Sequence, residues 1–539
     1  MAGRNSELKP PPVHVASSMA PFDLCLGIWV ISGLGIILYI LRQRITRSKL
    51  PLPPGPRKLP LVGNLFDVPS KYEWETYMAW SRKFKSDIIH LSLAGTSVIV
   101  LCSAEVTDAL LEKRSSIYSD RPTLPMLGDL MGWDFHLALM KYGNKWRTHR
   151  RLLSEGLDVV ESKSFRPKQL AAAHGLLLRL LHTPDSFMDH IRQMMSEIII
   201  SVAYGIDVLP ANDPLISLVE EGVKTVDEAG IPGMFLVDWF PALKHVPDWF
   251  PGAGFKRKAK EWRKLSQAIR DVPFSDAKRH IASGTASHSF TAKNLQTLSD
   301  SADAYFQEDA VKATAASMYS AGTDTTVSGI TTFFLAMLAN AEAQRKAQME
   351  IDAVLGAGHL PDFQDEETLP YVSALVKEVL RWRSVTPIAV PHFLAAEDEY
   401  RGYRLPAGSL VIGNAWGILH DEVMYPDPDA FNPERFLLEG KPNPNVRDPQ
   451  AAFGFGRRIC PGRHLATSSL WIAVVSILAV YDISKTVPED GEPIEPQHQY
   501  SSALVSAPLP FKCSIKPRSQ AAAALLESMA NQDHYSLGR

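Results

Sequence analysis

Cysteine is scarce in this sequence, with 4 among 539 residues. The four stand at positions 25, 102, 460 and 513 and form no Cys-x-x-Cys pair. This spacing excludes a disulfide-stapled scaffold and suits a reducing compartment. Cys460 and His464 stand four residues apart, but a structural zinc ion needs four ligands, so the sequence argues against such a site.

The chain also lacks a charge imbalance, internal repeats and a dinucleotide fingerprint. Its 56 Lys and Arg against 59 Asp and Glu leave a net charge of −3, which gives no reason to expect nucleic acid as a partner. No Gly-x-Gly-x-x-Gly stretch is present, so the sequence predicts no fused dinucleotide site. Helical periodicity dominates, short strands are expected within 90–101 and 400–412, and composition stays uniform up to about residue 515.

Uncharged hydrophobic residues are concentrated near the start, from Leu24 to Leu41. At about 1.5 Å per residue this run would span about 27 Å, close to one hydrocarbon core. Lys and Arg residues follow it, which by the positive-inside rule places the rest of the chain in the cytoplasm. The alternative is a cleaved signal peptide, but the run is long, the positive charge lies behind it and no small-residue cleavage site follows. We therefore expect a short lumenal tail at 1–22, a transmembrane anchor at 23–41 and a basic, proline-rich hinge at 42–65.

A glycine-rich turn around Cys460 is the stretch with the most specific chemistry. Gly454 and Gly456 let the backbone fold back so that N–H groups can point at the sulfur, and an apolar helix is expected over 463–475. The positive end of that helix favours a thiolate. A lone cysteine in such a turn is often only structural or reactive. A thiolate with arginines beside it also suits haem iron, where an arginine can bind a propionate.

An apolar helix pattern over 311–338 is interrupted by Ala-Gly-Thr-Asp-Thr-Thr at 321–326. Small residues at Ala321 and Gly322 would let a ligand approach the backbone. Thr325 can bond back to the carbonyl four residues earlier and open the helix, and Asp324 beside a hydroxyl can relay protons. The alternative is an N-cap or a polar patch.

Two further helical patterns pair polar groups on one face. Glu378 and Arg381 stand at i and i+3, which by itself is typical of a solvated surface pair. Trp146 and Arg150 stand at i and i+4, so an indole N–H and a guanidinium can bind one carboxylate. The alternative for this segment is a basic surface helix.

Together these stretches resemble the cytochrome P450 family. The loop Phe-x-x-Gly-x-Arg-x-Cys-x-Gly of that family is matched at all five fixed positions, by Phe453, Gly456, Arg458, Cys460 and Gly462. Residues 321–326 resemble the oxygen-activating helix motif of the family, while 378–381 and 433–436 resemble its Glu-x-x-Arg and Pro-x-Arg-Phe motifs. The resemblance covers residues 50 to 513. The sequence as a whole is most similar to fungal microsomal members of the family that act in secondary metabolism.

The resemblance implies a mainly α fold with small β-sheets, a catalytic domain at 66–515 and a loose C-terminal tail at 516–539. It implies haem b with Cys460 as the axial iron ligand and Phe453 beside it. Asp324 and Thr325 would bind O₂ and deliver protons, and Glu378, Arg381 and Arg435 would brace the cysteine loop. The propionate ligands implied by the resemblance are Arg121, Trp146, Arg150, His392 and Arg458.

The implied reaction inserts one oxygen atom from O₂ into a lipophilic small molecule such as a terpenoid or polyketide intermediate. NADPH would supply electrons through a separate cytochrome P450 reductase, with cytochrome b5 as a further partner, at the endoplasmic reticulum membrane. The family analogy builds the pocket from 122–135, Ser317, Ala321, 385–390 and 503–505, which are largely apolar. A docking face for the acidic reductase is expected at Lys145, Arg147, Arg151 and Arg457.

Three points stay open on the residues alone. The aromatic stretch 231–254 is either a buried connector or a loop that dips into the bilayer interface. A thiolate-haem isomerase or dehydratase would need neither O₂ nor a reductase, but the intact Asp324–Thr325 pair argues against it. A non-catalytic haem-binding protein would be expected to carry a signalling domain, and the sequence shows none beyond 515.

Overall fold

The computed structural model describes residues 50–537 apart from 231–233, 299–302, 357–358 and 489–490. The chain divides into two compact units, and Glu399–Arg404 belong to a small unit with the residues up to Leu52. The large unit comprises Pro53–Asp398 and Leu405–Arg539. It contains every candidate site residue, and the description below concerns it.

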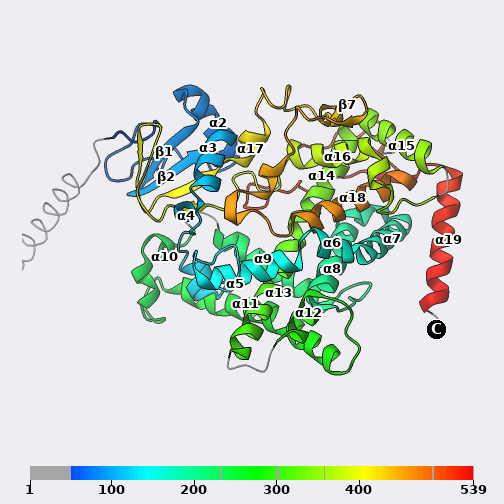
Figure 1. Ribbon diagram of the computed structural model, residues 1–539, viewed down its shortest axis with the longest axis horizontal. Helices are drawn as coiled ribbons and strands as arrows, with labels where there is room; N and C mark the ends of the chain where they lie inside the picture. Colours follow the sequence, from blue (N-terminus) through cyan, green and yellow to red (C-terminus); the bar gives the residue numbers. More distant parts are fainter. Residues whose placement is uncertain (1–49, 231–233, 299–302, 357–358, 489–490, 538–539) are drawn as a thin grey trace, which may run out of the picture. The chain divides into compact units, whose positions relative to one another are not determined.

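Helices make up most of the large unit (Figure 1). The helical periodicity predicted from the sequence is therefore confirmed. The helices are α2 (Glu73–Phe84), α3 (Ala104–Thr107), α4 (Ser115–Tyr118), α5 (Asn144–Gly156), α6 (Val159–Ser164), α7 (Arg166–His182), α8 (Phe187–Tyr204), α9 (Pro214–Gly230), α10 (Leu236–Trp239), α11 (Gly254–Ala282), α12 (Phe290–Gln296), α13 (Ala304–Gly322), α14 (Asp324–Ala339), α15 (Ala341–Leu355), α16 (Pro370–Trp382), α17 (Ala415–Leu419), α18 (Arg463–Val480) and α19 (Gln520–Leu537).

The strands are short and form small sheets, as predicted. The largest sheet has the order β1-β2-β6-β3; β1 and β2 are antiparallel with Ile88 opposite Leu101, and β6 runs parallel to β2 with Leu410 opposite Val98. The C-terminal strands β9 and β10 form an antiparallel pair. The strands are β1 (Ile88–Leu93), β2 (Thr96–Leu101), β3 (His392–Phe393), β4 (Asp398–Tyr400), β5 (Tyr403–Leu405), β6 (Leu410–Gly413), β7 (Leu437–Leu438), β8 (Lys441–Pro442), β9 (Tyr481–Ser484) and β10 (Ser514–Pro517).

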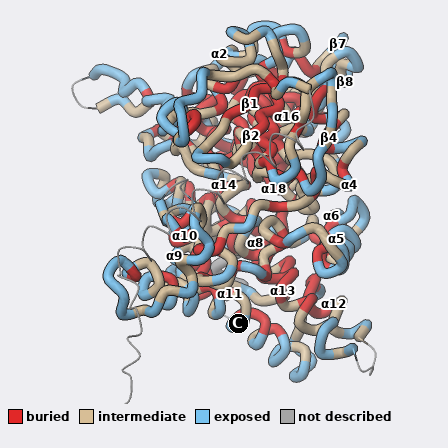
Figure 2. The backbone as a smooth tube through the Cα atoms, turned by 90° about the vertical axis from the view of Figure 1, so that its left-hand side faces the viewer, coloured by how far each residue is buried: buried red, intermediate tan, exposed pale blue. Residues whose placement is uncertain are grey.

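The core is built around α14 and α18, two apolar helices that pack on each other. Figure 2 shows buried residues along the inner elements and exposed residues on the outer turns. Burying a Phe or Leu side chain contributes about 1.5–3 kcal/mol, and Phe333, Phe334 and Leu335 of α14 are fully buried. Helix α18 begins just after Cys460, as predicted, and extends to Val480. It is apolar and long enough to cross a membrane, but 72% of it is buried in the protein.

The expected ends of the catalytic domain differ from the structure. The anchor at 23–41 and the lumenal tail at 1–22 lie outside the described residues. The expected hinge at 42–65 is packed from Pro53 onward, because the buried Asn64 accepts a hydrogen bond from the Ser92 N–H and donates to the Pro56 carbonyl. The expected loose tail at 516–539 is wrong over α19, where Ala522 and Leu526 stand one helical turn apart and are buried in the core.

Candidate active site around Cys460

The Cys460 loop is a tight turn held by its own backbone. The Cys460 N–H donates to the Phe453 carbonyl at 2.8 Å. Gly454 and Gly456 have φ angles of 82° and 55°, a left-handed region that favours glycine. A Cβ on Gly456 would also lie 2.0 Å from the Leu111 carbonyl oxygen. The sequence prediction that Gly454 and Gly456 let the backbone fold back before Cys460 is confirmed.

The sulfur of Cys460 lies in a mixed electrostatic environment. Burial raises the pKa of the Cys460 thiol, while the hydrogen bond from the Gly462 N–H and the charges of Arg150 and Arg463 act to lower it. The amide group and the two arginines thus act in the direction expected from the helix end, and burial opposes them. A metal cation bound to the sulfur removes the proton from a coordinating thiol.

The helix that crosses the core is broken at the motif 321–326. Helix α13 ends at Gly322, α14 begins at Asp324, and Thr323 between them has φ −81° and ψ −71°. The Thr325 Oγ1 donates to the Ala321 carbonyl at 2.8 Å, as predicted from the sequence. Ala321 is exposed although it lies in a core helix, so its surface faces open space at the break.

Gly322 has a different role from the predicted one. A Cβ at this position would lie 2.5 Å from the Ile199 Cδ1 of α8. The glycine is therefore needed for the close packing of α8 against the helix break, and only Ala321 remains as the small residue beside which a ligand can lie.

One loop segment joins the Cys460 loop to the broken helix. The Arg458 Nη1 donates to the Leu137 carbonyl at 3.1 Å, and the Leu137 N–H donates to the Ser317 Oγ at 3.2 Å. Arg458 precedes Cys460 by two residues, and Ser317 precedes Ala321 by one helical turn. The structure thus brings together two motifs that are more than 120 residues apart in the sequence.

Buried cations gather beside this segment. Arg121 is 4% exposed and donates to the carbonyls of Ala138, Val390 and Pro391. Burial and the nearby Arg458 hold the pKa of Arg121 well below its ordinary value. Burial likewise lowers the pKa of Arg458 to about 10, with Arg150 adding to the effect and Asp120 opposing it.

The other expected propionate ligands lie at the same place. His392 donates through Nδ1 to the Tyr118 carbonyl at 2.8 Å, and burial followed by the charge of Arg121 lowers its pKa far below the ordinary value. The Trp146 ring packs under the Arg458 guanidinium, 4.5 Å from its centroid. Its Nε1 is buried and has no hydrogen-bond partner among the described residues. Arg150 donates to the Ile459 carbonyl at 2.6 Å.

These residues fit a haem. Arg121 and Arg458 repel each other in a buried place, which two propionates would relieve, and the orphaned indole N–H of Trp146 needs an acceptor. Among the described residues, no group of three or more His, Cys, Asp or Glu is arranged to hold a metal ion. A single cysteine ligand, Cys460, in the loop that also carries Arg458 suits a flat, iron-containing group.

Asp324 is joined to a residue that the sequence did not indicate. Its Oδ1 accepts a hydrogen bond from the Arg192 Nη1 of α8, and the Arg192 Nε lies 3.5 Å from the Glu220 Oε1 of α9. No local pattern announces this link, because Arg192 and Asp324 are 132 residues apart.

Glu378, Arg381 and Arg435 form one buried network rather than surface pairs. The Glu378 carboxylate accepts two bonds from Arg381, at 2.7 and 2.8 Å, and one from the Arg435 Nε at 3.2 Å. Both Glu378 and Arg381 are 0% exposed. Arg381 and Arg435 also bind carbonyls of 419, 426, 427 and 430, so the network ties α16 to the segment that leads to the Cys460 loop.

The apolar segments assigned to the pocket also meet at α14. The Ser506 N–H donates to the Val385 carbonyl at 2.8 Å, and the Ser328 Oγ of α14 donates to the Ser506 carbonyl at 2.7 Å. The Val390 carbonyl accepts from Arg121 at 2.7 Å. The segments 385–390 and 503–505 are thus held next to the helix that carries Thr325.

Comparison with known proteins agrees with this geometry. A family model described as Cytochrome P450 matches residues 53–515. Cytochrome P450 monooxygenase 98 of Postia placenta is 47% identical over 93% of this chain and 97% of its own length. Cytochrome P450 monooxygenase ple1 of Rhodocybe pseudopiperita is 43% identical over 93% and 96%, and tryptamine 4-monooxygenase of Psilocybe cyanescens is 41% identical over 90% and 96%.

Proposed function

Because the chain belongs to the cytochrome P450 family and is a haem-thiolate monooxygenase, we propose that Cys460 is the axial iron ligand and that Arg121, Trp146, Arg150, His392 and Arg458 hold the propionates. The buried cations beside the Cys460 loop are the observation that carries this assignment. Phe453 closes the turn through its carbonyl, and the Glu378 network ties α16 to the segment that leads to the loop.

The test is the carbon monoxide difference spectrum of reduced membranes that contain the full chain. The wild type is expected to show the thiolate-haem band after which the family is named, and Cys460→Ser is expected to lose it. A band that survives in Cys460→Ser would contradict the assignment of the ligand.

Bound haem supplies the chemistry that activates O₂. The chain itself supplies protons and excludes water. The Thr325 hydroxyl donates to the Ala321 carbonyl, and Ala321 is exposed at the break, so a polar group lies beside the surface where a ligand can bind. Asp324 is partly exposed and follows the break directly, so it can take protons from solvent and pass them to the Thr325 hydroxyl.

The substrate we propose is a lipophilic small molecule of fungal secondary metabolism, such as a terpenoid or polyketide intermediate. The pocket segments 385–390 and 503–505 are largely apolar, and apolar walls with few polar groups are typical of such sites. NADPH-dependent turnover of candidate compounds in membranes tests this. Turnover of small charged molecules alone would contradict it.

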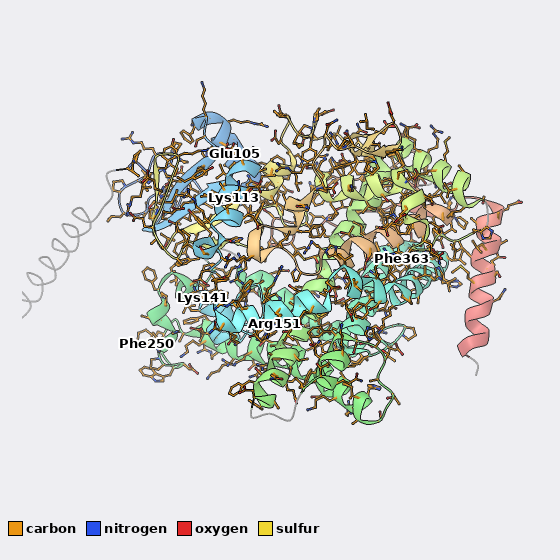
Figure 3. All side chains as sticks on the ribbon, in the orientation of Figure 1. Glu105, Lys113, Lys141, Arg151, Phe250 and Phe363 are labelled. Carbon is orange, nitrogen blue, oxygen red and sulfur yellow. The ribbon has the colours of Figure 1, made fainter. Side chains whose placement is uncertain are left out.

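Electrons are proposed to come from NADPH through a cytochrome P450 reductase, with cytochrome b5 as a second donor. Lys145, Arg147 and Arg151 are exposed on α5, where Figure 3 labels Arg151, and Arg457 is exposed three residues before Cys460. An acidic partner that docks there would lie next to the iron ligand.

Reversing Lys145 and Arg147 together to Glu is expected to slow haem reduction and to weaken its dependence on salt. Lys224→Glu with Lys516→Glu makes the same charge change at two other exposed positions and serves as the matched control. Equal reduction rates in the two double variants would rule out this docking face.

We also propose that the chain is held in the endoplasmic reticulum membrane by the anchor 23–41 and that the stretch around α10 contacts the bilayer. Leu236, Phe240, Trp249 and Phe250 are 65%, 62%, 79% and 50% exposed. Figure 3 shows Phe250 at the periphery near α10. Such exposed aromatic residues are typical of membrane interfaces.

Vesicle flotation of the chain without residues 1–41 tests this contact. Binding is expected, and Trp249→Ser with Phe250→Ser is expected to reduce it. Val423 is 91% exposed elsewhere, so Val423→Ser is the control for the loss of an exposed apolar side chain. A chain that does not float at all would contradict the proposal.

A further inference from the structure

Helix α8 packs antiparallel along the broken helix formed by α13 and α14. The rings of Tyr204 and Tyr319 lie 5.9 Å apart at one end, and those of Phe187 and Phe334 lie 5.0 Å apart at the other. Between these pairs, Ile199 fills the space beside Gly322. We call this interface the α8 seam.

Two hydroxyls in the middle of the α8 seam have no hydrogen-bond partner among the described residues: the Ser196 Oγ and the Thr323 Oγ1. Ser196 is 0% exposed and Thr323 is 2% exposed. Ser196 lies three residues before Ile199 and four after Arg192, hence on the same face of α8. Thr323 lies between Gly322 and Asp324, the two residues that Ile199 and Arg192 contact.

The behaviour of neighbouring hydroxyls makes these two unusual. Ser317, Ser320, Thr325 and Thr326 each donate to the carbonyl four residues earlier. Such back-bonding is the ordinary way for a hydroxyl to be satisfied inside a helix. The hydroxyls of Ser196 and Thr323 do not use it, so they remain available to another group.

A water molecule would satisfy both hydroxyls. Buried waters typically make about three hydrogen bonds to polar groups that would otherwise be unsatisfied. The hydroxyls of Ser196 and Thr323 offer two of these hydrogen bonds. The third can be accepted by the carboxylate of the neighbouring Asp324. Its Oδ1 is bound by Arg192, but its second oxygen is not part of that ion pair.

We propose that the α8 seam binds an ordered water between Ser196 and Thr323, and that this water is the immediate proton source for the Asp324 carboxylate. The water gives one proton to Asp324 and takes one from solvent at the rim of the seam. Arg192 and Glu220 form that rim, and their side chains are 34% and 28% exposed. The proposal rests on the proton-delivery role proposed above for Asp324.

The site itself is tested on the full-length, haem-loaded protein by an experimental structure that resolves ordered water. Density for one water between the two hydroxyls is expected. A hydroxyl pair that is bonded directly, or a dry gap, would overturn the proposal.

A double-mutant cycle in thermal stability gives an independent readout. If the water bridges the two hydroxyls, Ser196→Ala and Thr323→Val each lower the melting temperature, and the double variant loses little more than either single variant. If both hydroxyls are dry and unsatisfied, each substitution raises the melting temperature and the two effects add. The second pattern would overturn the proposal.

The role of the water in proton delivery is tested by measuring how the electrons from NADPH divide between peroxide and product. Ser196→Ala and Thr323→Val are expected to release several-fold more peroxide per NADPH and to increase the solvent isotope effect on product formation. Ser476→Ala is the matched control, because the Ser476 hydroxyl in α18 is also buried and unpartnered. Unchanged peroxide release in both seam variants would overturn the proton role.

Failure of the seam and failure of the proposed function give different results. If the seam proposal is wrong, the wild type keeps its carbon monoxide band and its product, and the seam variants match the Ser476→Ala control. If the proposed function is wrong, the wild type itself gives no thiolate band or no oxygenated product.

Discussion

Glu378→Gln is the substitution whose effect can be worked out most fully from the structure. The carboxylate of Glu378 accepts from the Arg381 Nε and Nη2, the Arg435 Nε and the Asn432 N–H. Glutamine has nearly the same shape, but it replaces one acceptor oxygen by an NH₂ group that points at a guanidinium. The change therefore removes the negative charge and leaves two buried cations facing a donor.

The magnitude follows from these contacts. Removing one partner of a buried ion pair costs about 3–5 kcal/mol, because the remaining charge is uncompensated. Here one carboxylate serves two guanidiniums, which places the loss at the upper end, about 5 kcal/mol. Domains are typically stable by about 5–15 kcal/mol, so the variant is expected to lose a large part of its stability and to yield less haem-loaded protein.

The matched control is Glu342→Gln. Glu342 and Arg345 have the same i, i+3 spacing and also form a two-bond pair, at 2.6 and 2.9 Å, but their side chains are 60% and 57% exposed. An exposed pair contributes about 0–1 kcal/mol. Denaturant unfolding followed by far-UV circular dichroism and by haem absorbance measures both variants. Equal losses for Glu378→Gln and Glu342→Gln would refute the view that burial makes the network essential.

Three other predictions concern the loop, the proton path and acid stability. Gly454→Ala is expected to cost about 1–3 kcal/mol from its φ of 82° alone, whereas Gly456→Ala also meets the Leu111 carbonyl and should lose more stability and more haem. Denaturant unfolding and haem content are measured for both variants. Equal losses would contradict the close approach of Gly456 to the Leu111 carbonyl. Asp324→Asn and Thr325→Val are expected to lower product formation by at least about tenfold while the carbon monoxide band persists. If both variants still form as much product per NADPH as the wild type, their role in proton delivery is contradicted. Burial, with a contribution from Lys145, lowers the pKa of His149 to about 4, so the folded state binds this proton more weakly than the unfolded chain does. The stability that His149 contributes is present above about pH 6.5 and is lost as the pH falls towards 4. Between pH 7 and pH 5 the free energy of unfolding of His149→Gln should therefore fall by about 2 kcal/mol less than that of the wild type. The same pH dependence of unfolding in both proteins would contradict this.

Local chemistry explains why much of the site could be predicted. Cys460, Gly456 and the Thr325 back-bond depend on residues within a few positions, so their geometry is contained in short motifs. The Glu378 network was predicted from its motifs, although its burial required the fold.

Features that depend on distant partners could not be predicted in the same way. The Arg192–Asp324 pair and the open hydroxyls of Ser196 and Thr323 arise only when α8 meets the broken helix. The sequence predicted that Gly322 leaves space for a ligand, but the Ile199 side chain of α8 fills the space beside it. Helix α19 was missed because alanine-rich sequence has a weak apolar face, and its helix is stabilised by the core against which Ala522 and Leu526 pack.

The loop segment clamped by Arg121 and Arg458 has a consequence for assembly. Both guanidiniums bind carbonyls in the range 137–140, and the half-buried Arg458 lies beside the buried Arg121. If the haem propionates lie beside these guanidiniums as proposed, they would act as counter-ions that complete the fold, besides anchoring the cofactor. Loading with haem and ordering of this segment would then be one cooperative event, and we expect the protein without haem to be cut by proteases first at this loop.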